Sequence, residues 1–140
     1  MKFLNFELSK PSFSIELNGL GYVWDLHNAG QFVGLKIIPT DNTVVMSWRI
    51  TGHPATQFSG CNLVFIGLKL LIVSSRDEEL PSSEDLCLSA ISKISPGSDE
   101  PDRRIKADWG KSDPFHLLFE FQSGRSIEVN AETVELVSVD

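Results

Sequence analysis

The sequence has few of the residues and motifs that identify an enzyme or a disulfide-stapled protein. It contains only two cysteines, Cys61 and Cys87, which form no CxxC pair, so neither a disulfide framework nor a cysteine metal site is predicted. HExxH, GxSxG and GxGxxG are all absent, which removes the usual signatures of zinc proteases, serine hydrolases and dinucleotide-binding proteins. We therefore predict no cofactor and no catalytic residue, and expect a protein that is not an enzyme.

Long apolar runs and an excess of positive charge are also missing. The longest apolar run, Leu63 to Val73, spans eleven residues and includes Lys69, whereas a membrane helix needs about twenty apolar residues. The first residues lack the continuous apolar segment and cleavage site of a signal peptide. The net charge of −7 disfavours nucleic-acid binding, because phosphates require clustered lysine and arginine. These absences predict a cytoplasmic protein that binds neither membrane nor nucleic acid.

What the chain does contain is period-two alternation of apolar and polar residues, which is typical of strands. At 140 residues with 41% hydrophobic content, it is long enough for one domain, residues 1–140, with a substantial core. Val33, Leu35 and Ile37 share one phase before the turn-forming residues 39–42. The segment 43–50 alternates again, with Val44, Met46, Trp48 and Ile50 on one face. A hairpin is predicted here.

The rest of the chain extends this pattern to about eight strands. Segment 115–122 places Phe115, Leu117, Phe119 and Phe121 inward, and strands over 125–129 and 133–139 are predicted to follow it as a meander. Segment 61–74 is apolar on both phases, which is typical of a central strand covered on both faces, and Gly67 inside it indicates a bulge or a close approach. We predict an all-β, single-domain antiparallel β-sandwich or open barrel. For 84–94 a strand is favoured, with one short helix near 83–94 as the alternative.

Two long polar connections, 74–85 and 95–114, carry the candidate binding residues. Their acidic clusters include Asp77, Glu78 and Glu79 in the first and Asp99 and Glu100 in the second. Such clusters are typical of a solvated rim, or of a negative face that attracts a basic protein partner. Trp109, a bulky aromatic in a polar loop, is either an interface anchor or a cover for the end of the sheet.

The stretch 24–28 groups a tryptophan, Asp25, His27 and an asparagine at the start of the hairpin. Asp25 and His27 are two residues apart, so in a strand they would point the same way and could share a metal or act as an oriented base. Residues of this kind more often cap a turn by accepting backbone N–H groups. We therefore interpret Asp25 and His27 as a structural corner. The alternative, a metal site, would need a further ligand from His53 or His116.

The order of these elements resembles that of a group of small bacterial proteins. The corner WDLHNA is followed by LVFIGLKLLIV, then by DLCLSAISKI, and the chain closes with FEFQSGRSIEV. This order resembles small bacterial all-β domains of uncharacterised families, some of which are grouped with the immunity proteins of polymorphic toxin systems. The resemblance implies a cytosolic, non-catalytic protein that binds and blocks a cognate toxin, and it carries over no site residue.

The leading hypothesis is a non-enzymatic interaction protein, immunity-like, that binds a basic partner through the acidic loops and Trp109. A first alternative is a small-ligand-binding β-barrel, which requires an interior cavity lined by Phe32, Trp48 and Phe119. A second alternative is a metal-dependent enzyme that uses Asp25 and His27 together with His53 or His116.

Overall fold

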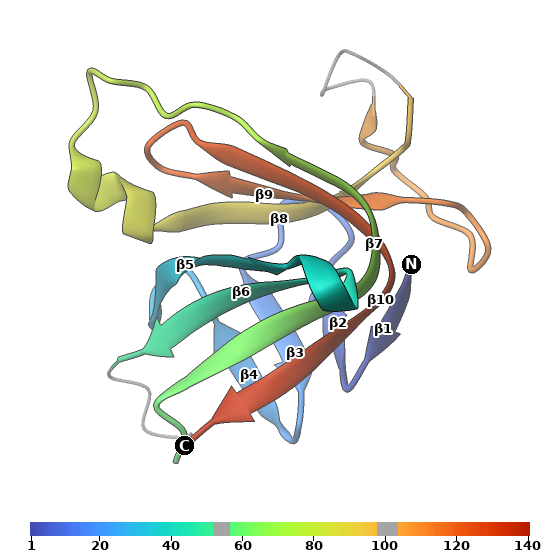
Figure 1. Cartoon of the computed structure of the whole chain (residues 1–140), viewed down its shortest axis with the longest axis horizontal. Helices are drawn as coiled ribbons and strands as arrows, with labels where there is room; N and C mark the ends of the chain where they lie inside the picture. The colour runs from blue at the N-terminus through green and yellow to red at the C-terminus, as the bar shows by residue number, and fades with distance from the viewer. Residues whose placement is uncertain (52–56, 98–103) are drawn as a thin grey trace.

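Strands arranged in two sheets make up most of the protein (Figure 1). The computed structural model describes residues 1–51, 57–97 and 104–140. The larger, seven-stranded sheet has the order β5–β6–β7–β10–β9–β8, with β1 beside β10. Its strands are β1 (Lys2–Leu4), β5 (Gly30–Ile38), β6 (Thr43–Ile50), β7 (Gly60–Val73), β8 (Leu88–Ile94), β9 (His116–Phe121) and β10 (Ser126–Val139). The smaller sheet contains β2 (Phe6–Leu8), β3 (Glu16–Gly19) and β4 (Tyr22–Asp25) in that order.

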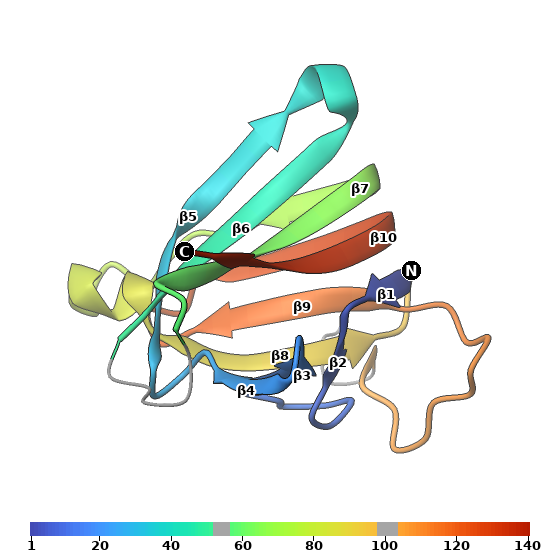
Figure 2. The ribbon, with the colours of Figure 1, turned by 90° about the horizontal axis from the view of Figure 1, so that it is seen from below.

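The larger sheet curls into a half-barrel, as the prediction of an open barrel requires. Phe32 on β5 and Phe121 on β9 lie four places apart in the strand order, yet their ring centroids are 4.8 Å apart. Figure 2 shows the smaller sheet on the concave side, facing β6, β7 and β10. The predicted all-β class is therefore confirmed, with one departure from antiparallel pairing, because β1 runs parallel to β10.

Aromatic side chains fill the interior of this half-barrel. Trp48 lies 5.1 Å from Phe32 and 5.9 Å from Phe119, measured between ring centroids, and all three side chains are buried. Trp24 and Leu17 of the smaller sheet are buried in the same cluster. The cavity that a small-ligand barrel would require between Phe32, Trp48 and Phe119 is therefore occupied by the rings themselves.

The predicted strands 125–129 and 133–139 are in fact one strand, β10. It pairs with β7 along its whole length, and the register between them shifts at Asn130–Ala131. Gly67, next to this shift on β7, has a φ of 72°, which confirms the irregularity predicted there. The chain bends at this point instead of turning back, so the division into two strands was wrong.

Two predictions about sheet faces were also wrong. β7 is covered on one face only, because Ile66 and Ile72 are exposed. On β5, Val33 is exposed although it shares its sequence phase with Leu35 and Ile37. Ile37 keeps the inward phase, opposite the buried Val44, and is exposed because it lies near the end of the hairpin. The register between β5 and β6 shifts between Phe32 and Gly34, so that Phe32 takes the buried position beside Trp48. A bulge of one residue reverses the faces of a strand, which the alternation alone does not reveal.

The ambiguous segment near 84–94 contains a short 3₁₀ helix followed by a strand. The 3₁₀ helix spans Ser82–Leu86 and β8 begins at Leu88, so the favoured strand is confirmed and the helical signal belongs to its approach. The hairpin predicted around 39–42 is present as β5 and β6, joined by a second 3₁₀ helix at Pro39–Asp41. In the described ranges, no helix is long and apolar enough to cross a membrane.

We expect Phe119→Ala to lower the free energy of unfolding by about 3–5 kcal/mol, because it opens a cavity at a fully buried ring. Phe13→Ala is the matched control, since that ring is 55% exposed, and its cost should stay below about 0.5 kcal/mol. Urea unfolding monitored by tryptophan fluorescence measures both. Equal costs for the two variants would contradict the filled half-barrel.

Candidate functional site

The corner at residues 25–28 is a hydrogen-bonded turn. Asp25 Oδ1 accepts the backbone N–H of His27 at 3.0 Å and that of Asn28 at 2.7 Å, and Asp25 Oδ2 accepts the Asn28 side chain at 2.9 Å. Burial by itself raises the pKa of Asp25, but these hydrogen bonds outweigh it and hold the pKa below its ordinary value. His27 Nδ1 lies 2.6 Å from the backbone oxygen of Leu88, which ties the corner to β8. The turn-capping role predicted for Asp25 is confirmed.

His27 and His116 lie too far apart to share a metal. His27 contacts Leu88 at the start of β8, whereas His116 pairs with Ile94 at its end. At about 3.3 Å per residue, the ends of this strand are roughly 20 Å apart. His53 lies outside the described residues. Within 1–51, 57–97 and 104–140, no group of three or more histidine, cysteine, aspartate or glutamate side chains is placed to hold a metal ion.

Trp109 and the first acidic cluster lie at opposite ends of β9. Trp109 contacts Phe115, directly before this strand, with their ring centroids 6.1 Å apart. The Asp77 N–H donates to the Ser123 carbonyl, directly after the strand. The two predicted parts of one binding surface are therefore separated by about 20 Å, the length of a strand of this size. Asp99 and Glu100 lie outside the described residues.

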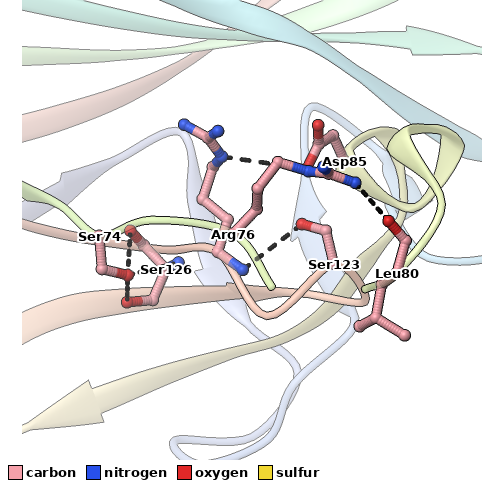
Figure 3. Close-up of polar contacts among 7 residues, drawn as sticks. Ser74, Arg76, Leu80, Asp85, Ser123 and Ser126 are labelled. Atoms are coloured by element: carbon pink, nitrogen blue, oxygen red, sulfur yellow. Dashed lines mark hydrogen bonds and ion pairs between the residues drawn. The ribbon is translucent and has the colours of Figure 1, made fainter. Parts of the chain in front are cut away.

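Arginines accompany the exposed carboxylates of Asp77, Glu78 and Glu79. Arg76 Nε lies 3.2 Å from Asp85 Oδ1, and its Nη2 donates to the Leu80 carbonyl at 2.7 Å (Figure 3). Arg125 Nε lies 3.9 Å from the same Asp85 oxygen. The Ser123 hydroxyl and then these two arginines hold the pKa of Asp85 below its ordinary value. This end of the molecule is a mixed ionic network that fixes the 74–86 connection.

The other end of β9 carries a cleft of about 760 Å³. It exists because β9 and β1 follow one another along the same edge of β10, with Leu117 paired to Val129 and Phe3 paired to Val134. Residues from β1, β2, β8 and the connection before β9 meet at this junction. The cleft is lined by Met1, Lys2, Phe3, Phe6, Glu7, Leu8, Pro11, Lys93, Ala107, Asp108, Trp109, Lys111 and Phe115.

Aromatic rings contact one another along this cleft. Phe3 stacks on Phe6 with ring centroids 4.7 Å apart, and Phe115 meets Phe3 edge-on at 5.5 Å. Trp109 extends the series from Phe115, and Lys106 Nζ lies 4.8 Å from the centre of the Trp109 ring. The Trp109 indole nitrogen is buried and has no hydrogen-bond partner in the described part of the chain. Trp109 thus folds back over the sheet, and its partly exposed ring forms one wall of the cleft.

One carboxylate, that of Glu128, holds both ends of the segment that carries Trp109. Arg104 donates to it twice, from Nη1 to Oε1 at 2.9 Å and from Nη2 to Oε2 at 2.6 Å. His116 Nδ1 lies 2.7 Å from Oε2 of the same group. Arg104 Nε also donates to the carbonyl of Ser95 at 2.7 Å. A two-pronged arginine contact fixes orientation as well as distance, so it restrains the wall of the cleft.

The environment of Glu128 favours its ionised form. Glu128 is 8% exposed, and burial by itself raises its pKa. The hydrogen bonds and positive charge of Arg104 and His116 outweigh that effect and hold the pKa below its ordinary value. The carboxylate therefore stays ionised, and the two-pronged contact with Arg104 that restrains the 104–116 segment is retained, at neutral pH.

Sequence reasoning found Trp109 but missed the residues around it. Glu128 stands between the inward-facing Ile127 and Val129, so the alternation assigns it to the solvent. Lys93 belongs to the segment whose structure was ambiguous, and Phe3 is far away in the sequence. A charged residue between two inward-facing residues of a strand is usually exposed, so its position does not predict a buried ion pair or identify the arginine that would form it.

Comparisons with known proteins do not add a function to this geometry. No protein-family model, curated protein or solved structure matches the chain. The resemblance to immunity proteins therefore stays a prediction.

We expect Glu128→Gln to lower the free energy of unfolding at neutral pH by about 3 kcal/mol, because it removes a nearly buried charge that Arg104 and His116 share. A carboxylate with a lowered pKa stabilises the fold fully above the unfolded-state pKa of about 4.3 and loses this effect as the pH falls further. The difference between the two proteins should therefore shrink below about pH 4. Urea unfolding at both pH values measures it.

Lys106→Gln is the control for this experiment. It removes an ion pair with Asp113 whose side chains are 41% and 39% exposed, and the contact of Lys106 with the Trp109 ring, so the expected cost is below about 1 kcal/mol. A Glu128→Gln effect of the same size as this control, or one that did not change with pH, would contradict the role of Glu128.

Proposed function

We propose that this chain is a non-enzymatic interaction protein whose binding surface is the cleft between β1, β8 and the 104–116 segment. The observation that carries the proposal is the row of aromatic rings on the cleft wall, formed by Phe3, Phe6, Phe115 and Trp109. Large aromatic side chains supply most of the affinity at protein interfaces, because they bury much area while losing little conformational entropy.

The rigidity of the cleft supports the same function. Its wall is held through Glu128 at both ends, at Arg104 and at His116. A surface that is ordered before its partner arrives loses less entropy on binding, so more of the contact energy appears as affinity.

The binding of a basic partner through the acidic loops is a separate hypothesis. Its support is the exposure of Asp77, Glu78 and Glu79, at the opposite end of β9 from Trp109. Arg76 and Arg125 stand within this cluster and weaken its negative field. An immunity-like role in the cytoplasm, in which the protein blocks a toxin by binding it, is one form that the proposal takes. Whether or not the partner is a toxin, we place the anchoring contact at the cleft.

A tagged pull-down from the lysate of the source organism, quantified by mass spectrometry, tests the proposal. We expect Trp109→Ala to reduce the captured partner by about tenfold or more, since truncating a central interface tryptophan commonly costs that much affinity. The triple variant Asp77→Asn, Glu78→Gln, Glu79→Gln should retain capture within about twofold.

The reverse pattern would move the binding surface to the acidic loop and favour the basic-partner hypothesis. Capture that neither variant changed would contradict both surfaces. Cooperative thermal unfolding of Trp109→Ala is the accompanying control, because it separates the loss of a contact from the loss of the fold.

A further inference from the structure

The cleft gathers lysines on a chain whose net charge is −7. Lys2, Lys93 and Lys111 line it, and none of the three forms an ion pair in the part of the chain that the structure describes. Two carboxylates, Glu7 and Asp108, line it as well. The lining therefore carries three positive and two negative side chains, which makes it locally cationic on an acidic protein.

Lys93 holds its charge directly above the aromatic rings of the cleft. Its Nζ lies 4.5 Å from the centre of the Phe115 ring and 5.5 Å from that of Phe3. Such cation–π contacts position an ammonium group while leaving its outer face available to an anion. An occupant of the cleft would therefore meet apolar ring surface and a positive charge side by side.

We propose that the cleft binds a segment of a partner protein in which one or two carboxylates flank a large apolar side chain. This inference rests on the proposed function and names the partner's chemistry. The apolar side chain packs on Phe115 and Trp109, and a neighbouring carboxylate pairs with Lys93. Charge complementarity supports this occupant, since a carboxylate contributes a charge-assisted contact to each lysine that lacks an ion pair.

The two acidic side chains of the lining restrict which acidic segments fit. Glu7 and Asp108 line the same cleft as the aromatic rings. A long run of carboxylates would place like charges against them, which costs affinity. The expected segment is therefore sparsely acidic and apolar at its centre, and not a polyacidic tail.

Three capped heptapeptides test the inference. Each has a central phenylalanine, which is flanked by two aspartates in the first, by two asparagines in the second and by two lysines in the third. Binding is measured from the Trp109 indole signal in ¹H–¹⁵N spectra, assigned with the Trp109→Phe variant. We expect the aspartate peptide to bind about fivefold or more tightly than the asparagine peptide, and the lysine peptide to bind most weakly.

Variants locate the effect at the cleft. Lys93→Gln should remove most of the preference for aspartate over asparagine, and Lys36→Gln on β5, outside the cleft lining, should retain it. Lys111→Gln, at an exposed position, is the second test variant should Lys93→Gln unfold.

Each contrary outcome has a distinct meaning. Equal binding of the aspartate and asparagine peptides, or tighter binding of the lysine peptide, would overturn the charge assignment and leave the cleft as a binding surface. Binding of none of the peptides would overturn the segment class proposed here. The proposed function is judged separately, by the capture of the partner with Trp109→Ala.

Discussion

The carboxylate of Glu128 is the contact on which the candidate site depends. It holds Arg104 and His116, the two ends of a segment that otherwise crosses the surface as a connection. Burying three polar side chains costs desolvation free energy, and apolar side chains packed at the same place often stabilise a fold equally well. Stability alone therefore does not explain this ionic cluster. Its structural consequence is that Trp109 has a defined place beside Phe115. A cleft wall built from a loop becomes a fixed surface in this way.

The long strands β7 and β10 decide where that cleft lies. Because β10 is fourteen residues long, one of its edges accommodates two neighbours in succession, β9 over the first half and β1 over the second. The junction between these neighbours brings the N-terminal aromatic residues against the residues before β9. The larger sheet curls over a buried aromatic core, whereas the junction leaves aromatic rings along the wall of a cleft.

Much of the fold was predictable from local patterns. The hairpin of β5 and β6, the inward phase of β9 and the strand at 88–94 followed from alternation and turn residues. The bulge at Val33 and the continuity of β10 were not predictable, because each depends on the partner strand that pairs across from it. A local pattern describes one strand, whereas register and bending are properties of a pair.

For the site, the sequence by itself determined the net charge of −7, the presence of a tryptophan in a polar loop and the presence of a capping aspartate at residue 25. It also determined the role of Asp25, because the backbone N–H groups that this carboxylate accepts belong to residues two and three positions away. Only the tertiary structure decided that Trp109 stands apart from Asp77 and contacts Phe115, the ring that Phe3 and Lys93 also contact. The physical reason is the sequence separation of the residues that make each contact. Turns and caps are made by neighbours in the chain, whereas a cleft is made by residues that meet only after the strands have paired.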